Sequence, residues 1–246
     1  AQAIAAMAYG TESVPKVDVI AGPGNVYVAL AKREVAGLVG IPSAFTGPSE
    51  VVVVADHTVP SAFAAIDVVV QAEHGPDGLA WLVTWDEEVA DAVEADVVRI
   101  AEASARRDDV ADTLASAGWT VLVDGPEEAL AVADAIAPEH LQLMVDGAED
   151  FADRVRHAGA VFCGPWTPAV LGDYVAGPSH VLPTAGTARF SGALTVADFT
   201  KEVHIVSADR SALERLAPHV SALAGAEGLD AHAASVRIRT QGGNGG

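Results

Sequence analysis

Gln71 and His74 stand three residues apart near the end of a predicted helix, and their side chains could share one metal ion. The helix is predicted from Pro60 and is ended by Gly75-Pro76. Residues three apart leave from the same helical face. An imidazole nitrogen suits zinc and its neighbours, whereas an amide oxygen is a harder and weaker ligand. Two ligands do not make a site, and the alternative that both residues only cap a helix end stays open.

Further groups with suitable chemistry come later in the chain. Asp173 and His232 are the later candidates for metal ligands. Glu139 and His140 are adjacent at a predicted helix-to-strand junction. Imidazole titrates near neutrality, and a neighbouring carboxylate can tune it or activate water, so the two form a plausible general acid/base pair. Taken alone, Pro-Glu-His is also a common surface tripeptide.

The composition limits the class of protein. The chain has 246 residues, half of them hydrophobic, which suffices for a core in one large or two small domains. A net charge of −20 repels phosphate backbones and anionic membranes, so we expect neither a nucleic-acid nor a membrane partner. Cys163 is the only cysteine, which excludes an intramolecular disulfide and fits a reducing, cytoplasmic compartment. Residues 1–9 already resemble the middle of an Ala-rich helix, so we expect a chain cut from a longer one.

The first part of the chain predicts a strand, a glycine turn and a helix after the Ala-rich helix. The strand is expected at 17–20, the turn is Ala21-Gly-Pro-Gly-Asn25, and the helix is expected at Val26–Val35. This order is typical of a nucleotide-binding βα unit. Tyr27 stands where the full dinucleotide fingerprint needs its third glycine. A simple turn between strand and helix is therefore an equally good interpretation.

The middle of the chain alternates strands with helices. Four consecutive valines within Glu50–Ala55 predict a strand covered on both faces, as in a parallel sheet. The rhythm predicts an α/β fold with a mostly parallel sheet. Strands are expected at 50–55, 79–85, 120–123, 141–144 and 158–163, and helices at 60–74, 87–105, 127–136 and 150–157.

Beyond Cys163 the pattern changes. Residues 164–187 hold four Pro and four Gly without helical or strand periodicity, and a loop this long is usually functional or disordered. It carries Asp173 and His180, which favours function. A strand at 203–206 and helices at 210–223 and 228–238 are predicted to follow as a small separate unit.

Several motifs in fixed order resemble the histidinol dehydrogenase family. The resemblance runs from residue 1 to about residue 239 and corresponds to the C-terminal part of the family's longer chains. The motifs are Ala21-Gly-Pro-Gly-Asn25, Gly47-Pro-Ser-Glu50, Gln71-Ala-Glu-His74, Ala137-Pro-Glu-His-Leu141, Gly172-Asp-Tyr174, His180-Val-Leu-Pro-Thr184 and Glu227-Gly-Leu-Asp-Ala-His232.

The resemblance implies a zinc-dependent, NAD-linked oxidation of L-histidinol to L-histidine, the last steps of histidine biosynthesis. It also implies an intertwined homodimer that shares its active sites. Carried over by motif, the expected zinc ligands are Gln71, His74, Asp173 and His232, the last donated by the partner subunit. The expected catalytic residues are Glu139 and His140. The expected substrate contacts are Ser49, His180 and Glu227, and the expected cofactor contacts are Gln2 and Asn25.

The same resemblance sets expectations for domains and fold. We expect incomplete Rossmann-like, mostly parallel sheets with helices on both faces, and a small C-terminal helical dimerisation tail. The expected divisions are 1–48, a cofactor-side part; 49–193, the main α/β domain with the metal and catalytic residues; and 194–246, the tail.

Two departures from the family leave alternatives open. The stretch Ile41-Pro-Ser-Ala-Phe-Thr46 is one residue longer than is usual in the family and lacks its Asp, so a paralogue acting on another small polar alcohol is the first alternative. The absent N-terminal part makes an inactive metal-binding fragment the second alternative. Zinc and manganese both fit a donor set with one amide and one carboxylate.

Overall fold

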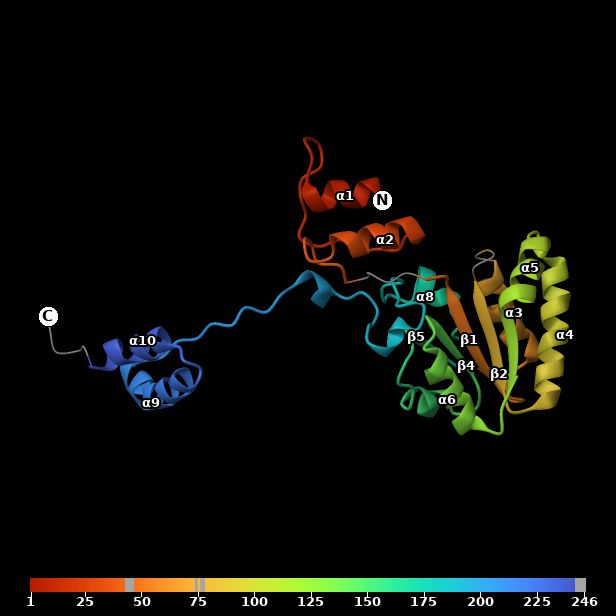
Figure 1. The fold of residues 1–246 in the computed structure, drawn as a ribbon. Helices are drawn as coiled ribbons and strands as arrows, with labels where there is room; N and C mark the ends of the chain where they lie inside the picture. Colours follow the sequence, from red (N-terminus) through yellow and green to blue (C-terminus); the bar gives the residue numbers. More distant parts are fainter. Residues whose placement is uncertain (43–46, 74, 76–77, 242–246) are drawn as a thin grey trace. The chain divides into compact units, whose positions relative to one another are not determined.

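The computed structural model describes residues 1–42, 47–73, 75 and 78–241 of the chain. By its internal contacts the chain forms two compact units, Ala1–Thr200 and Lys201–Gly246, which are described separately (Figure 1). The expected three-part division stays a prediction.

The first unit opens with two helices, α1 (Gln2–Tyr9) and α2 (Val26–Val35). Their apolar faces share a small core that includes Ile4 and Ala8. The predicted strand at 17–20 is reduced to one parallel bridge between Val19 and Gly40. Over residues 1–42 the structure therefore has only isolated β-bridges, and it contains no strand of several residues.

The rest of this unit is built on a parallel sheet, which confirms the predicted α/β fold. Within the described residues the sheet has five strands in the order β3-β2-β1-β4-β5. The order reverses beside β1, as in a doubly wound fold. The strands are β1 (Glu50–Ala55), β2 (Leu79–Thr84), β3 (Gly118–Leu122), β4 (His140–Met144) and β5 (Ala160–Cys163).

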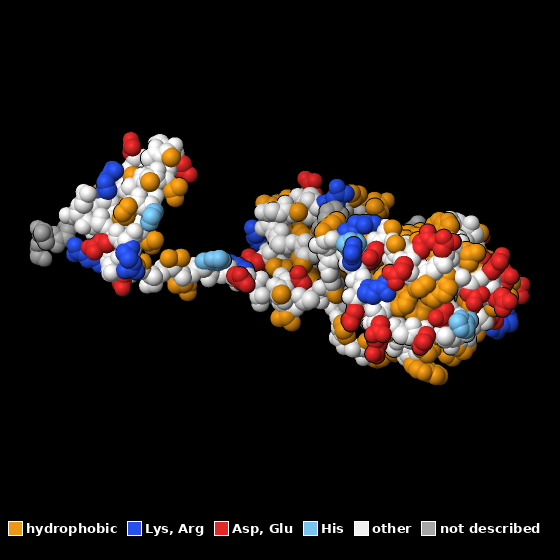
Figure 2. All heavy atoms as spheres, turned by 90° about the horizontal axis from the view of Figure 1, so that it is seen from below, with side chains coloured by type: hydrophobic (Ala, Val, Ile, Leu, Met, Phe, Trp, Pro, Cys, Tyr) orange, Lys and Arg blue, Asp and Glu red, His pale blue; other side chains and the backbone are white. Residues whose placement is uncertain are grey.

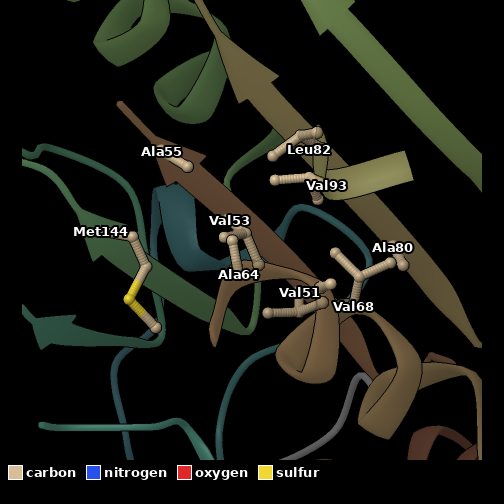
Figure 3. Packing of buried hydrophobic residues seen from close by; sticks show 10 residues of the cluster. Val51, Val53, Ala55, Ala64, Val68, Ala80, Leu82, Val93 and Met144 are labelled. Atoms are coloured by element: carbon tan, nitrogen blue, oxygen red, sulfur yellow. The ribbon is translucent and has the colours of Figure 1, made fainter. Parts of the chain in front are cut away.

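The central strand β1 is buried along its whole length, as its valine run predicts. Successive side chains of a strand point to opposite faces, so the four valines divide between two cores. Val51 and Val53 pack with one set of helices, and Val52 and Val54 with another. Figure 3 shows the first core, in which Val51 and Val53 lie against side chains of the helix that follows β1.

Helices cover both faces of the sheet (Figure 1). The face with Val51 is covered by α3 (Ser61–Ala72), α4 (Glu87–Ala103) and α5 (Arg107–Ala117). The face with Val52 is covered by α6 (Pro126–Ile136) and α7 (Ala148–Ala152). Helix α5 was not predicted from the sequence, and α7 ends at Ala152 rather than at residue 157 as predicted.

The chain after β5 departs furthest from the predictions. The long loop contains a short helix, α8 (Val170–Tyr174), and two 3-10 turns follow, η1 (Thr187–Arg189) and η2 (Val196–Phe199). The predicted strand at 203–206 is wrong, because these residues form no strand pairing with any described part of the chain. Ile205 and Val206 are more than nine-tenths exposed, so no described strand lies against them.

The second unit is a pair of helices, α9 (Arg210–Ala226) and α10 (Asp230–Gln241). Gly228, in a left-handed conformation, makes the turn between them. Their contact is made by small residues such as Ala217, Ala224 and Ala233, while Leu223 stays exposed. Among the described helices, none is long and apolar enough to cross a membrane. Figure 2 shows acidic side chains scattered over the visible face of the first unit, without a continuous basic patch.

Candidate active site

The candidate catalytic residues lie at the amino edge of the sheet, where β1 and β4 begin. His140 opens β4 and is paired in register with Val51, the second residue of β1. Glu139 directly precedes β4, and Glu50 opens β1. Open α/β sheets usually bind ligands at the carboxyl edge of such a strand pair. Here the acid/base groups are gathered at the opposite edge of the same pair.

A tight turn delivers Glu139 and His140 to this edge. Helix α6 ends at Ile136, and the next residue, Ala137, adopts a left-handed conformation with φ of 55° and is completely buried. Its N–H donates to the carbonyl of Ala133 and closes the helix end. Left-handed backbone is uncommon for a residue with a side chain and is found at functional sites. Pro138 then leads the chain directly into the strand.

The backbone of Glu50 holds both catalytic candidates. Its N–H donates to Oε2 of Glu139 over 3.1 Å, and its carbonyl lies 3.2 Å from Nδ1 of His140. A carbonyl oxygen can only accept, so Nδ1 carries the hydrogen. The neutral imidazole therefore has its lone pair on Nε2, which lies 3.7 Å from Oδ1 of Asp173. His140 is thus oriented as a base whose reactive nitrogen is next to a carboxylate.

Glu139 is tuned to change protonation near neutral pH. Burial raises the pKa of its carboxyl to about 7. Hydrogen bonds from the Glu50 N–H and the Ser49 side chain oppose this pKa shift, and the nearby acids Glu50 and Asp173 add to it. A carboxyl group with a pKa in this range can both accept and return a proton during catalysis. Ser49, a predicted substrate contact, therefore lies beside the carboxyl group of the predicted catalytic residue Glu139.

The predicted metal ligands are only partly placed. Gln71 is buried in the last turn of α3, and its Nε2 finds no hydrogen-bond partner among the described residues. Asp173 lies on α8, partly exposed, beside His140. His74 lies outside the described residues. His232 is exposed near the start of α10 in the second unit, so its position relative to the other ligands is not determined.

The donor set fits a zinc ion in chemical type. The amide of Gln71 is buried with its Nε2 unpaired among the described residues, and its oxygen is the atom that could ligate a metal. An aspartate oxygen is a common zinc donor. In the part of the chain that the structure describes, no three His, Cys, Asp or Glu side chains converge as a metal centre by themselves. The other two predicted donors are His74, outside the described residues, and His232 of the second unit, so the predicted ligand set stays a prediction.

Asp67, one helical turn before Gln71, was missed by the sequence analysis. It is buried on α3, and its Oδ2 has no hydrogen-bond partner within the described residues. Burial raises the pKa of its carboxyl to about 6. The signal in the sequence was an acid inside an otherwise apolar helix, between Ile66 and Val68.

The predicted cofactor contacts and the remaining predicted substrate contacts come from other elements of the chain. Gln2 is exposed at the start of α1. Asn25 caps α2, its side chain accepting a hydrogen bond from the N–H of Val28 over 3.2 Å. His180 is exposed in the loop after α8, and Glu227 is exposed at the end of α9. The roles predicted for these four residues stay predictions.

The comparisons with known proteins all match this chain to the same family. The model of the histidinol dehydrogenase family matches residues 1–240. The histidinol dehydrogenase of Parasynechococcus marenigrum is 49% identical over 239 residues, covering 97% of this chain and 54% of the relative. That of Bacillus cereus is also 49% identical, covering 97% and 56%.

A solved structure agrees with these relatives. The crystal structure of histidinol dehydrogenase from Elizabethkingia anophelis superposes with a TM-score of 0.92 at 35% identity, covering 99% of this chain and 56% of that chain. The chain thus spans about half the length of the curated relatives that it matches.

Proposed function

The chain belongs to the histidinol dehydrogenase family, and we propose that its protein oxidises L-histidinol to L-histidine through the aldehyde, using zinc and NAD. The observation that carries the proposal is the buried pair Glu139 and His140, both held on the backbone of Glu50. A metal-binding module without activity has no need of such a pair. A biosynthetic oxidation of this kind also fits a reducing, cytoplasmic compartment.

His140 is the proposed base of the first oxidation. A hydride leaves carbon more easily as the neighbouring hydroxyl loses its proton, so a base must lie within hydrogen-bond reach. The Nδ1–H bond to the Glu50 carbonyl keeps the lone pair on Nε2. That nitrogen takes the proton, and Asp173 at 3.7 Å stabilises the resulting imidazolium.

Glu139 is the proposed base of the second step. The aldehyde must add water before it can lose another hydride, and a carboxylate can remove a proton from that water. With a pKa of about 7, Glu139 is present in both protonation states at neutral pH. Its hydrogen bonds to Glu50 and Ser49 fix the carboxyl while the water attacks.

The remaining roles follow the family motifs. Gln71, His74, Asp173 and the partner subunit's His232 would hold zinc, which would orient the substrate through its imidazole and amine. NAD, when bound, supplies the hydride acceptor, and Gln2 and Asn25 are its proposed contacts. The proposed substrate contacts are Ser49, His180 and Glu227. The proposal therefore requires a homodimer with shared sites.

The test is formation of NADH from L-histidinol, followed by absorbance. It compares this chain with a version extended to the length of its relatives, each with and without added zinc. Turnover that a chelator abolishes in the extended protein supports the proposal. No turnover of histidinol, together with turnover of another small alcohol, would identify a paralogue instead.

A single substitution tests the assignment of roles. Glu139→Gln keeps the size of the side chain and an oxygen that can accept from the Glu50 N–H. We expect this variant to release aldehyde and to yield close to one NADH per histidinol, where the parent yields two. A variant that still forms L-histidine at the parent rate would refute the role of Glu139.

A further inference from the structure

We propose that Glu50 is a positioning residue that links the acid/base pair to the segment His180-Val-Leu-Pro-Thr-Ala185. This inference rests on the proposed function for its catalytic consequence. Its structural part rests on the hydrogen bonds of Glu50 alone. Glu50 is a buried carboxylic acid at the head of a strand whose next four residues are valines. Such a residue is costly to bury without a specific purpose.

The backbone and the side chain of Glu50 hold different parts of the site. The backbone groups contact Glu139 and His140, as described above. The side-chain Oε1 accepts a hydrogen bond from the N–H of Ala185 over 2.8 Å. The contact joins positions that are 135 residues apart in the sequence. One residue therefore touches both catalytic candidates and the loop that carries a predicted substrate contact.

The Glu50 bond is one of several contacts that hold the turn around Ala185. Ala185 is in a left-handed conformation with φ of 55°, which a residue with a side chain adopts at a cost. Thr184 is buried, and its hydroxyl oxygen accepts from the N–H of Gly47 over 2.5 Å. The carbonyl of Thr184 in turn accepts hydrogen bonds from the N–H and the hydroxyl of Thr187. The turn is thus fixed by contacts on either side of the Glu50 bond.

The same segment passes close to the backbone of Glu139. A Cβ placed on Gly159 would lie 2.6 Å from the carbonyl oxygen of Glu139 and 3.1 Å from Cδ of Pro183. Only a glycine fits between the two at this separation. Loss of the Glu50–Ala185 bond should therefore loosen a segment that packs, through Gly159, beside the backbone of Glu139. The segment includes His180, a predicted substrate contact five residues before Ala185, so its placement is expected to depend on the same bond.

Asp56 provides a matched control at the other end of β1. It is also a buried carboxylic acid, and its Oδ2 accepts from the N–H of Asp146 over 3.2 Å. Its Oδ1 accepts from the N–H of Thr58 over 2.9 Å. Asp56 thus fixes loops at the carboxyl edge, away from the catalytic pair. A substitution there removes comparable bonds without touching the candidate site.

The experiment uses the protein extended to the length of its relatives and three variants, Glu50→Ala, Glu50→Gln and Asp56→Ala. Steady-state kinetics give kcat and KM for L-histidinol, and melting gives stability. Hydrogen–deuterium exchange is measured on peptides that cover residues 180–187. Gln retains an oxygen at the position of Oε1, so it serves as the conservative rescue of Glu50→Ala.

We expect Glu50→Ala to lower kcat/KM for histidinol roughly 10- to 100-fold, because misplacement of a positioning contact costs rates of this order. Exchange over 180–187 should rise about tenfold, as for the loss of one hydrogen bond to a charged acceptor. Glu50→Gln should restore both. Asp56→Ala should lower the melting temperature and leave both quantities as in the parent.

Two outcomes would overturn the inference. Unchanged exchange over 180–187 in Glu50→Ala would show that Glu50 does not anchor the segment. A kinetic loss no larger than that of Asp56→Ala would show a structural role only. If the parent protein does not oxidise histidinol, the proposed function fails, and the exchange measurement still decides whether Glu50 holds the segment.

Discussion

Glu139→Gln should change the pH dependence of stability in a direction set by the burial of the carboxyl. Burial raises the pKa of Glu139 from 4.5 to about 7 in the folded protein. Below pH 4.5 the carboxyl is protonated in both the folded and the unfolded chain, so its burial carries no ionisation cost. Between pH 4.5 and 7 the unfolded chain loses the proton while the folded protein keeps it. Wild-type stability therefore falls across this interval.

The size of the effect follows from the pKa difference. A difference of about 2.5 pKa units corresponds to about 3 kcal/mol of unfolding free energy above pH 7. Gln cannot ionise, and its oxygen can still accept from the Glu50 N–H. We therefore expect equal stability of the two proteins at pH 4 and an advantage of about 3 kcal/mol for Glu139→Gln at pH 8.

The assay is urea unfolding of the chelator-treated protein at a series of pH values. Asp67→Asn is the matched control, because burial raises the pKa of Asp67 from 3.8 to about 6. As pH rises, the gain in unfolding free energy of Asp67→Asn over wild type should therefore reach its maximum about one pH unit below the pH at which the gain of Glu139→Gln does. A difference between Glu139→Gln and wild type that stays constant from pH 4 to pH 8 would refute the reasoning.

Three further predictions use other contacts of the site. Thr113→Val removes a hydroxyl that donates to the carbonyls of Gly75 and Asp109; unfolding in urea should show a loss of about 1–3 kcal/mol, which Thr113→Ser largely restores. Gly172→Ala places a Cβ 2.7 Å from Cζ of Phe162. This variant should lose about 1–3 kcal/mol of unfolding free energy, and the resulting shift of α8 should weaken zinc binding measured by calorimetry. Gly225→Ala, with open space at its Cβ, should change neither quantity. If His232 is donated by the partner subunit, zinc occupancy should fall on dilution through the dimer dissociation range; constant occupancy would contradict shared sites.

Local pattern was enough to predict most of the sheet and several of the residues now found together. The valine run of β1 predicted a strand buried on both faces, and the structure divides those valines between two cores. The Pro-Glu-His motif correctly placed Glu139 and His140 at the start of a strand. These features depend on residues near one another in the sequence, so a pattern can report them.

Features that depend on distant contacts were not predicted. Neither the strand order nor the gathering of acids at the amino edge can be read from periodicity, because both require β1 to pair with β4. Glu50 was quoted only as part of a motif, and its role depends on Glu139 and Ala185, 89 and 135 positions away. The strand expected at 203–206 failed for the same reason. An apolar β-branched run becomes a strand only when another strand is available to pair with it.

The pairing of β1 with β4 also decides when the site can appear during folding. Glu50 meets Leu79 on β2 after closing a short loop, whereas its contact with Glu139 closes a loop of 89 residues. Loop closure costs more entropy as the loop lengthens, and pairings distant in sequence slow folding. We therefore expect β1, β2 and β3 to associate first, giving an intermediate with a partial sheet but no acid/base pair. In refolding experiments, the circular dichroism signal of the sheet should then recover before the raised pKa of Glu139 does.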